Sequence, residues 1–360
     1  MDLLWRYGMC LSKDGRWNEA EAAIAEVLEI EKRGLGADHP DTLNSMANLA
    51  STYRNQGQWD KAEELKVQVL EARKTKLGAD HPDTLTSMNN LASIYWDQGR
   101  LDEAEELEVQ VLEARKTKLG ADHPATLNSM ANLALIYRDQ GQLDKAEELE
   151  VQALEARKTK LGADHPDILT SMNNLASIYW DQGRLDEAEE LEVQVLEARK
   201  TKLGADHPDT LTSMNNLASI YWDQGRLDEA EELEVQVLEA RKTKLGADHP
   251  ATLNSMANLA LTYRNQGQWD KAEELSVQVL ETSKIKLGAD HPDTLTSINN
   301  LAWIWKKYGR DIEAFKLMEE CVKARTRILG TSHPSTLFSR QALLEWQTEK
   351  SEIGASADRE

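Results

Sequence analysis

The chain has few of the residues that build disulfide-stabilised, metal-binding or membrane-spanning proteins. Its 360 residues include two cysteines, Cys10 and Cys321, which are too few for a disulfide framework and lack the spacing of a metal-binding motif. No uninterrupted apolar stretch approaches the roughly 20 residues that cross a bilayer, and residues 1–11 lack the pattern of a signal peptide. We therefore expect a chain in a reducing compartment, with a cytoplasmic location.

Basic residues are outnumbered as well. The sequence has 42 Lys and Arg residues against 63 Asp and Glu residues, which gives a formal net charge of −21. Since nucleic acids and anionic membranes attract clustered Lys and Arg, we expect neither of them as a partner. The proportions of hydrophobic residues, 40%, and charged residues, 29%, are typical of a folded chain rather than a disordered one.

Proline occurs in a single motif, and that motif reveals an internal repeat. Each of the eight prolines follows one of the eight histidines, and successive His-Pro pairs lie 42 residues apart. A fixed period of this length indicates stacked supersecondary units rather than independent domains. The histidines are His39, His81, His123, His165, His207, His249, His291 and His333.

Two helices are predicted in each unit. In the unit that begins at His81, apolar residues with helical spacing predict a first helix over about 82–98, capped by Asp80 or His81. Gly99 ends this helix, and a second helix is predicted over about 101–119.

Small, aromatic and acidic residues predict which faces are buried. Ala92 and Ala104 recur in every full unit, and side chains of that size let two helices approach to about 8–10 Å. Tyr95 and its counterparts are predicted to lie in the core. Glu103 and Glu106 fall on the opposite face of the second helix, so much of the negative charge is predicted to be exposed.

The recurring residues resemble those of a known family. The run Asn90-Leu91-Ala92, followed by Tyr95, Gly99, Asp102, Ala104 and Leu107, looks like a tetratricopeptide repeat. That repeat usually has a period of about 34 residues. The longer form found here resembles the repeats of kinesin light chains and is similar to the C-terminal arrays of fungal NLR-like signalling ATPases. The resemblance implies an all-α fold, a right-handed superhelical solenoid of antiparallel helix pairs. HEAT and armadillo arrays are the alternative on period alone, but the Gly-x-x-Asp-x-Ala turn favours the tetratricopeptide repeat.

Deviations at the two ends predict the domain organisation. A single solenoid is expected over residues 1–350, with no second domain. It would consist of a shortened first unit, 1–38, seven full units over 39–332, and a lone capping helix within 333–350. Residues 351–360 are small and polar and are predicted to be disordered.

A row of asparagines marks the candidate ligand surface. The resemblance implies that the polar face of each first helix lines a concave groove. A side-chain amide offers two donors and an acceptor, so a ladder of amides could bind the backbone of an extended peptide. With helices about 10 Å apart and about 3.3 Å per extended residue, seven rungs would follow about twenty residues. The alternative is that the amides bridge adjacent helices, and the two roles are compatible. The rungs are Asn48, Asn90, Asn132, Asn174, Asn216, Asn258 and Asn300.

A second position on this face varies between two residue types that are enriched in binding hot spots. An arginine there could pair with an acidic ligand group, and a tryptophan could stack on an apolar or planar one. The alternative is that the tryptophans pack on the next helix. The members are Arg54, Arg138 and Arg264, and Trp96, Trp180 and Trp222.

These features predict a non-enzymatic scaffold that binds an extended peptide or protein segment, acting as a sensor or adaptor. An acidic and aromatic segment would suit the surface. Kinesin light chains bind tryptophan-acidic cargo peptides, so a cargo adaptor is one alternative, although no heptad coiled coil is present. The other is a consensus array, designed or recently duplicated, without a specific ligand, because residues 81–122 are identical to residues 207–248.

No residue pattern predicts catalysis, a metal or a cofactor. Histidines one repeat apart would lie about 10 Å from each other, whereas zinc ligands lie about 2.0–2.1 Å from a shared ion. No recurring nucleophile accompanies them, and neither a phosphate-binding loop nor a dinucleotide fingerprint occurs. We therefore expect no enzyme activity, no cofactor and no metal site.

Overall fold

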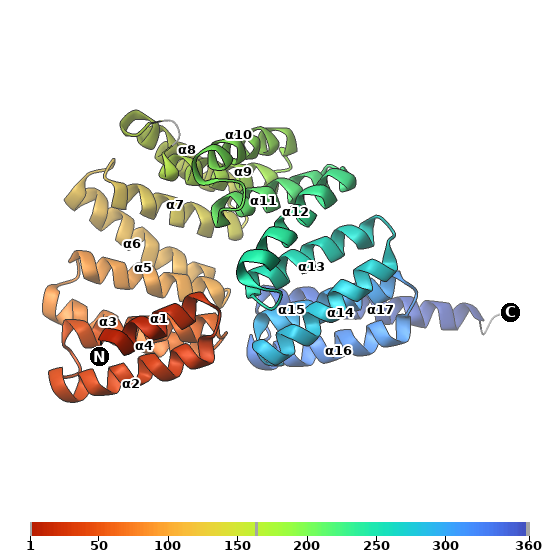
Figure 1. Ribbon diagram of the computed structural model, residues 1–360, viewed down its shortest axis with the longest axis horizontal. Helices are drawn as coiled ribbons and strands as arrows, with labels where there is room; N and C mark the ends of the chain where they lie inside the picture. Colours follow the sequence, from red (N-terminus) through yellow and green to blue (C-terminus); the bar gives the residue numbers. More distant parts are fainter. Residues whose placement is uncertain (1, 163–164, 358–360) are drawn as a thin grey trace. The chain divides into compact units, whose positions relative to one another are not determined.

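The structure is a computed structural model that describes residues 2–162 and 165–357. These residues form 17 helices in sequential antiparallel pairs (Figure 1). We call the first helix of each pair the A helix and the second the B helix. The A helices are α1 (Asp2–Lys13), α3 (Pro40–Asn55), α5 (Pro82–Asp97), α7 (Pro124–Asp139), α9 (Pro166–Asp181), α11 (Pro208–Asp223), α13 (Pro250–Asn265) and α15 (Pro292–Lys307). The B helices are α2 (Trp17–Leu35), α4 (Trp59–Leu77), α6 (Leu101–Leu119), α8 (Leu143–Lys160), α10 (Leu185–Leu203), α12 (Leu227–Leu245), α14 (Trp269–Lys286) and α16 (Asp311–Ile328), and α17 (Pro334–Ala357) follows them.

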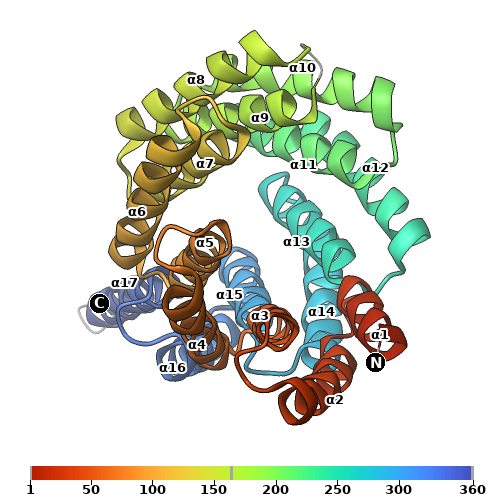
Figure 2. The ribbon, with the colours of Figure 1, turned by 90° about the vertical axis from the view of Figure 1, so that its left-hand side faces the viewer.

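The chain divides into two compact units, Met1–Arg226 and Leu227–Glu360. Within the first unit, the helices follow a curve, with the A helices α7, α9 and α11 on its inner side and the B helices α8 and α10 on its outer side (Figure 2). The prediction of one continuous solenoid over residues 1–350 stays a prediction.

Each full repeat begins with the same local structure, which the His-Pro pair explains. Proline fits the first turn of the A helix, where no intrahelical acceptor exists for a backbone N–H. The preceding histidine acts as the N-cap, as at His81, whose Nδ1 accepts a hydrogen bond from the backbone N–H of Asp83 at 3.2 Å. Thr84 adds a bond from its hydroxyl to the carbonyl oxygen of Gly78 at 2.8 Å. In one repeat the buried Ile168 stands at this threonine position, so that bond is missing.

The turns between helices depend on glycine. Gly99 follows the A helix with φ of 73°, and Gly120 follows the B helix with φ of 95°. Both values lie in the left-handed region, which side chains with a Cβ rarely adopt. The glycine positions therefore set where each helix ends.

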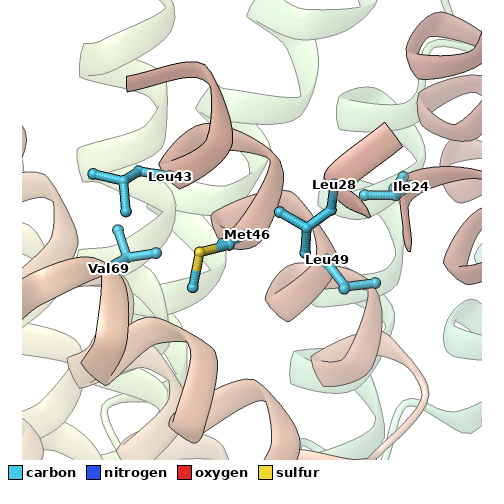
Figure 3. Packing of buried hydrophobic residues seen from close by; sticks show 6 residues of the cluster. All are labelled: Ile24, Leu28, Leu43, Met46, Leu49 and Val69. Carbon is cyan, nitrogen blue, oxygen red and sulfur yellow. The ribbon is translucent and has the colours of Figure 1, made fainter. Parts of the chain in front are cut away.

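Within each unit, the core is built from the predicted apolar stripe and links neighbouring repeats. Figure 3 shows the first part of it, where Ile24 and Leu28 of α2 lie near Met46 and Leu49 of α3, and Val69 of α4 joins them. Small residues sit at the helix crossings. Ala92 and Ala104 are 2% and 0% exposed and pack against Ile136 of the next repeat.

The predicted helix boundaries agree closely with the observed ones. The second helix of the repeat that begins at His81 was expected over 101–119 and is Leu101–Leu119. Tyr95 is half-buried beside the core rather than fully inside it, with the guanidinium of Arg100 stacked 4.0 Å from its ring centroid. At the end of the chain, α17 runs past Lys350 to Ala357, through the first part of the segment that we expected to be disordered, because no proline interrupts this helix. None of the described helices is both long and apolar enough to cross a membrane.

Candidate functional site

The predicted asparagine rungs occupy one position on each A helix from α3 to α15. All seven side chains are half-buried. At two rungs the amide bridges neighbouring A helices: Asn132 donates to Oδ1 of Asn89 at 2.8 Å, and Asn216 donates to Oδ1 of Asn173 at 2.9 Å. Within the first unit, the structure therefore uses at least these two amides in the stacking of repeats.

The position that varies between arginine and tryptophan also connects successive A helices. The guanidinium of Arg54 pairs with Asp97, with one N–H bond of 3.0 Å, and Nε1 of Trp96 donates to Asp139 at 2.6 Å. The partner lies 43 residues further along the chain in both cases. Trp180 and Asp223 form the same kind of pair. Arginine and tryptophan are therefore structurally equivalent at this position, because each donates an N–H hydrogen bond to the carboxylate at the end of the next A helix.

These pairs change what the arginines can offer to a ligand. Arg138 lies 2.9 Å from Asp139 and 3.3 Å from Asp181, so its charge is already compensated. The Asp97 carboxylate raises the pKa of Arg54. The expectation of an acidic ligand rested on unpaired arginines, and these two arginines no longer provide that basis.

The remaining two residues at this position, Arg264 and Trp222, do not donate a hydrogen bond to a carboxylate of the next A helix among the described residues. Arg264, in the second unit, donates to the amide oxygen of Asn265 at 3.2 Å, and burial lowers the pKa of its guanidinium. Trp222 is half-buried, and its Nε1 has no hydrogen-bond partner among the described residues.

One position that the sequence reasoning missed carries buried charge in the B helices. Glu103 and Glu106 are exposed as predicted, but Glu108, two residues further on, is only 1% exposed. The signal was available, because Glu108 lies one helical turn after the buried Ala104 and one turn before the buried Leu112. Its charged counterparts in the array are Lys66, Glu150, Glu192 and Glu234, which are all between 0% and 5% exposed.

Burial shifts the pKa of these groups toward the neutral form. It raises the pKa of Glu108 to about 7, against the opposing effects of Asn132, Arg115 and Ser129. It raises the pKa of Glu192 to about 7 as well, against Ser213, Arg199 and Asn216. The pKa of Glu234 is also raised to about 7, and that of Glu150 is raised, in both cases chiefly by burial. Lys66 shows the converse, since burial lowers its pKa to about 8.

A small cavity of about 60 Å³ joins these features in the first unit. It lies between α5, α6 and α7 and is lined on its polar side by Glu108, Asn89, Ser93 and Asn132. The indole of Trp96 and the apolar residues Ala92, Leu135 and Ile136 complete the wall. The cavity therefore brings two predicted site residues, Trp96 and Asn132, together with the buried carboxyl that was not predicted.

No group of three or more His, Cys, Asp or Glu side chains that could hold a metal ion occurs among residues 2–162 and 165–357. The histidines are accounted for by their capping bonds, as at His207, whose Nδ1 accepts from the backbone N–H of Asp209 at 3.2 Å.

Family models match most of the sequence. One model, described as tetratricopeptide repeat, matches residues 1–75, 47–117, 152–201 and 167–243. A second model with the same description matches residues 126–167, 252–293 and 294–335. The predicted repeat type is thereby confirmed. No curated protein sequence matched the chain.

Several solved structures are similar. Nearly identical TPR-like repeats from Podospora anserina, named as a kinesin light chain, are 36% identical and cover 57% of this chain and 97% of that one, with a TM-score of 0.47. BtubC (BKLC) from P. vanneervenii is 22% identical and covers 64% of this chain and 90% of that one, with a TM-score of 0.49. A Rap protein complexed with Competence and Sporulation Factor is 13% identical and covers 98% of both chains, with a TM-score of 0.54, so it shares the fold. The predicted similarity to NLR-like arrays stays a prediction.

Proposed function

Because this chain belongs to the tetratricopeptide repeat family, we propose that it is a non-enzymatic protein–protein interaction scaffold whose A-helix face binds an extended segment of a partner protein. By the A-helix face we mean the side of the A helices that carries the asparagine row and the neighbouring arginines and tryptophans. The wider setting of the scaffold, as sensor, adaptor or cargo-selecting array, stays a prediction.

The observation that supports this proposal most is that half-buried asparagines occupy the same position on successive A helices of the first unit. Asn132 and Asn216 use N–H groups to bridge A helices, and each keeps a carbonyl oxygen that can accept a bond from a peptide backbone. Indole rings accompany the row, and Trp180 is 36% exposed, so part of its surface is available for contact. Aromatic side chains of this kind supply large contact areas at low entropic cost.

Among the three arginines at the position that varies between arginine and tryptophan, Arg264 of the second unit has no carboxylate partner in the described part of the chain. Arg264 hydrogen-bonds only to an amide, whereas Arg54 and Arg138 have acidic partners. An acidic and aromatic partner segment, as the sequence suggested, would therefore depend on Arg264. R264Q should then weaken the binding of acidic peptides, and R54Q should weaken it much less.

The test of the scaffold is an unbiased peptide-display selection on the full chain. The counter-selection uses N132A/N174A, which removes two neighbouring rungs of the row. The matched control is Q110A/Q194A, because both glutamines are exposed on the outer B helices. We expect enriched peptides to lose at least tenfold in affinity for the asparagine variant and to keep their affinity for the glutamine control.

Two results would contradict the proposal. Peptides that bind the asparagine variant and the unchanged chain equally well would show that the row only stabilises the stacking. A selection without any enriched peptide would exclude an extended segment as the ligand and would favour the consensus array without a specific ligand.

A further inference from the structure

The first unit contains the same constellation of side chains twice. In the first copy, an asparagine and a tryptophan of one A helix, a buried glutamate of the following B helix and an asparagine of the next A helix line one cavity. The second copy repeats the four residues at the same positions, with a buried glutamate and the same asparagine–asparagine bond. The first copy is Asn89, Trp96, Glu108 and Asn132, and the second is Asn173, Trp180, Glu192 and Asn216.

Few hydrogen bonds reach these two buried glutamates, although Asn132 and Ser129 act on Glu108 and Ser213 and Asn216 act on Glu192. Glu192 is 0% exposed, and neither of its carboxylate oxygens has a hydrogen-bond partner among the described residues. Glu108 lines the cavity and has the amide of Asn132 at 3.4 Å from Oε1, which is a long bond. A buried carboxylate without a close donor is destabilising unless it is protonated or meets a cation.

The chain itself shows that an ammonium group fits this location. Lys66 occupies the glutamate position one repeat earlier, and its Nζ donates to the carbonyl oxygen of Ala47 at 2.9 Å and approaches Oγ of Ser51 at 3.3 Å. Ala47 and Ser51 correspond to Asn89 and Ser93, which line the cavity beside Glu108. The oxygens that hold an ammonium group in one repeat are therefore repeated next to a carboxyl in the following one.

We propose that the cavity beside Glu108 binds the primary ammonium group of a lysine side chain that belongs to the partner segment, and that the site beside Glu192 binds a second one. This inference rests on the proposed function, since it names the chemistry of the segment that would lie on the A-helix face. A volume of about 60 Å³ exceeds the space that one water molecule needs, so it admits an ammonium group. The three N–H donors of the ammonium group can meet the Glu108 carboxylate and the Ser93 hydroxyl, and the indole of Trp96 adds a cation–π contact.

The distance between the two sites predicts the spacing of two lysines in the partner segment. The sites are two repeats apart, which corresponds to about 20 Å if successive A helices lie about 10 Å apart. An extended segment advances about 3.3 Å per residue, so two lysines separated by about six positions would reach both sites. The part of the segment that lies over these two sites is therefore expected to be basic, in agreement with the net charge of −21.

The direct test uses n-butylammonium, which mimics the end of a lysine side chain, and needs no peptide. In a chain labelled with ¹⁵N-tryptophan, W96F identifies the indole N–H resonance of Trp96. We expect this resonance to shift saturably during the titration, and we expect E108Q to weaken the apparent affinity at least tenfold. The matched control is E106Q, which removes a charge from an exposed position of the same helix. A shift that persists unchanged in E108Q, or no shift in the unchanged chain, would overturn the proposal.

A pH titration of the unchanged chain provides a second readout that does not depend on a variant. The charged group that acts on Glu108 is Arg115 on the same helix. The polar groups around it are neutral, namely Asn132 and Ser129 of α7 and Asn89 and Ser93 of α5. Because the pKa of Glu108 is about 7, most of it is protonated at pH 6 and ionised at pH 8. n-Butylammonium should therefore bind about tenfold more weakly at pH 6 than at pH 8. Equal affinity at both pH values would contradict a role for this carboxylate.

The peptides enriched in the display selection test this inference separately from the proposed function. Enriched peptides should contain paired lysines, and replacement of these lysines by norleucine should reduce their affinity at least tenfold. If enriched peptides tolerate norleucine, the scaffold function stands and the lysine sites are refuted. If butylammonium shifts the Trp96 resonance but no peptide is enriched, the cation site stands and the extended-segment function is refuted.

Discussion

Glutamate at the buried B-helix position makes the stability of the chain depend on pH near neutrality. A carboxyl with a pKa of about 7 in the folded state and about 4.3 in the unfolded state binds its proton more tightly when folded. Its contribution to stability is therefore complete below about pH 4 and is lost as the pH rises to about 7. Glu108 and Glu192 both behave in this way, so their contributions add over the same range.

E192Q tests this dependence, because glutamine keeps the shape of the side chain and cannot ionise. We expect the gain in stability from the variant to be about 2–3 kcal/mol larger at pH 8 than at pH 5, since one pKa unit corresponds to about 1.4 kcal/mol. Thermal unfolding followed by circular dichroism at both pH values measures the difference. The control is E190Q, which neutralises an exposed glutamate of α10. A stability difference that is the same at pH 5 and pH 8 would contradict the assignment.

At the level of elements, the helices could be predicted closely and the contacts between them could not. Proline, histidine and glycine act locally, so the start of α5 at Pro82 and the end of α6 at Leu119 follow from the sequence alone. The pairing of Trp96 with Asp139 depends on how one A helix lies against the next, which a helical pattern does not contain. The buried Glu108 was missed because acidic residues in a highly charged helix were assigned to the exposed face.

The exchange of arginine and tryptophan between repeats predicts the result of two substitutions at one residue. W96R keeps an N–H donor for Asp139, so the free energy of unfolding should change by less than about 1 kcal/mol. W96A removes the donor and the packing of the ring, and it should cost about 2–4 kcal/mol. Urea unfolding monitored by circular dichroism provides the comparison. If both variants lose the same stability, the hydrogen bond to Asp139 contributes nothing.

At the scale of the whole molecule, the described repeats within each unit pack mainly on their neighbours along the chain. Consecutive helices form the main contacts, and those between alternate helices, such as α7 and α9, are fewer. Stability in such an array is approximately a sum over repeats and over the interfaces between adjacent repeats. A substitution that destabilises one interface should then lower the stability of the adjacent repeats, and the whole chain should not unfold in a single step.

A central substitution tests this additive behaviour. Ala176 is 1% exposed on α9, so A176W should overpack one crossing and separate the unfolding of the repeats before it from that of the repeats after it. We expect two resolved transitions in thermal unfolding where the unchanged chain shows fewer. Q194W, at an exposed position of α10, controls for the added ring. A single transition with an unchanged width in A176W would refute the additive picture.

The pairs between successive A helices also bear on how such a gene can change its length. Each of these repeats carries its own donor, such as Trp96, and directly after it an acceptor for the donor of the preceding repeat, here Asp97, which pairs with Arg54. Unequal crossing-over between near-identical units removes or adds whole multiples of 42 codons. If residues 123–206 were lost in this way, Asp223 would lie 43 residues after Trp96 and would become the acceptor of its indole N–H. In the present chain, Asp223 already accepts a hydrogen bond from another tryptophan, Trp180. The new junction would be chemically the same as an old one, so the array could lengthen or shorten in evolution without a compensating mutation.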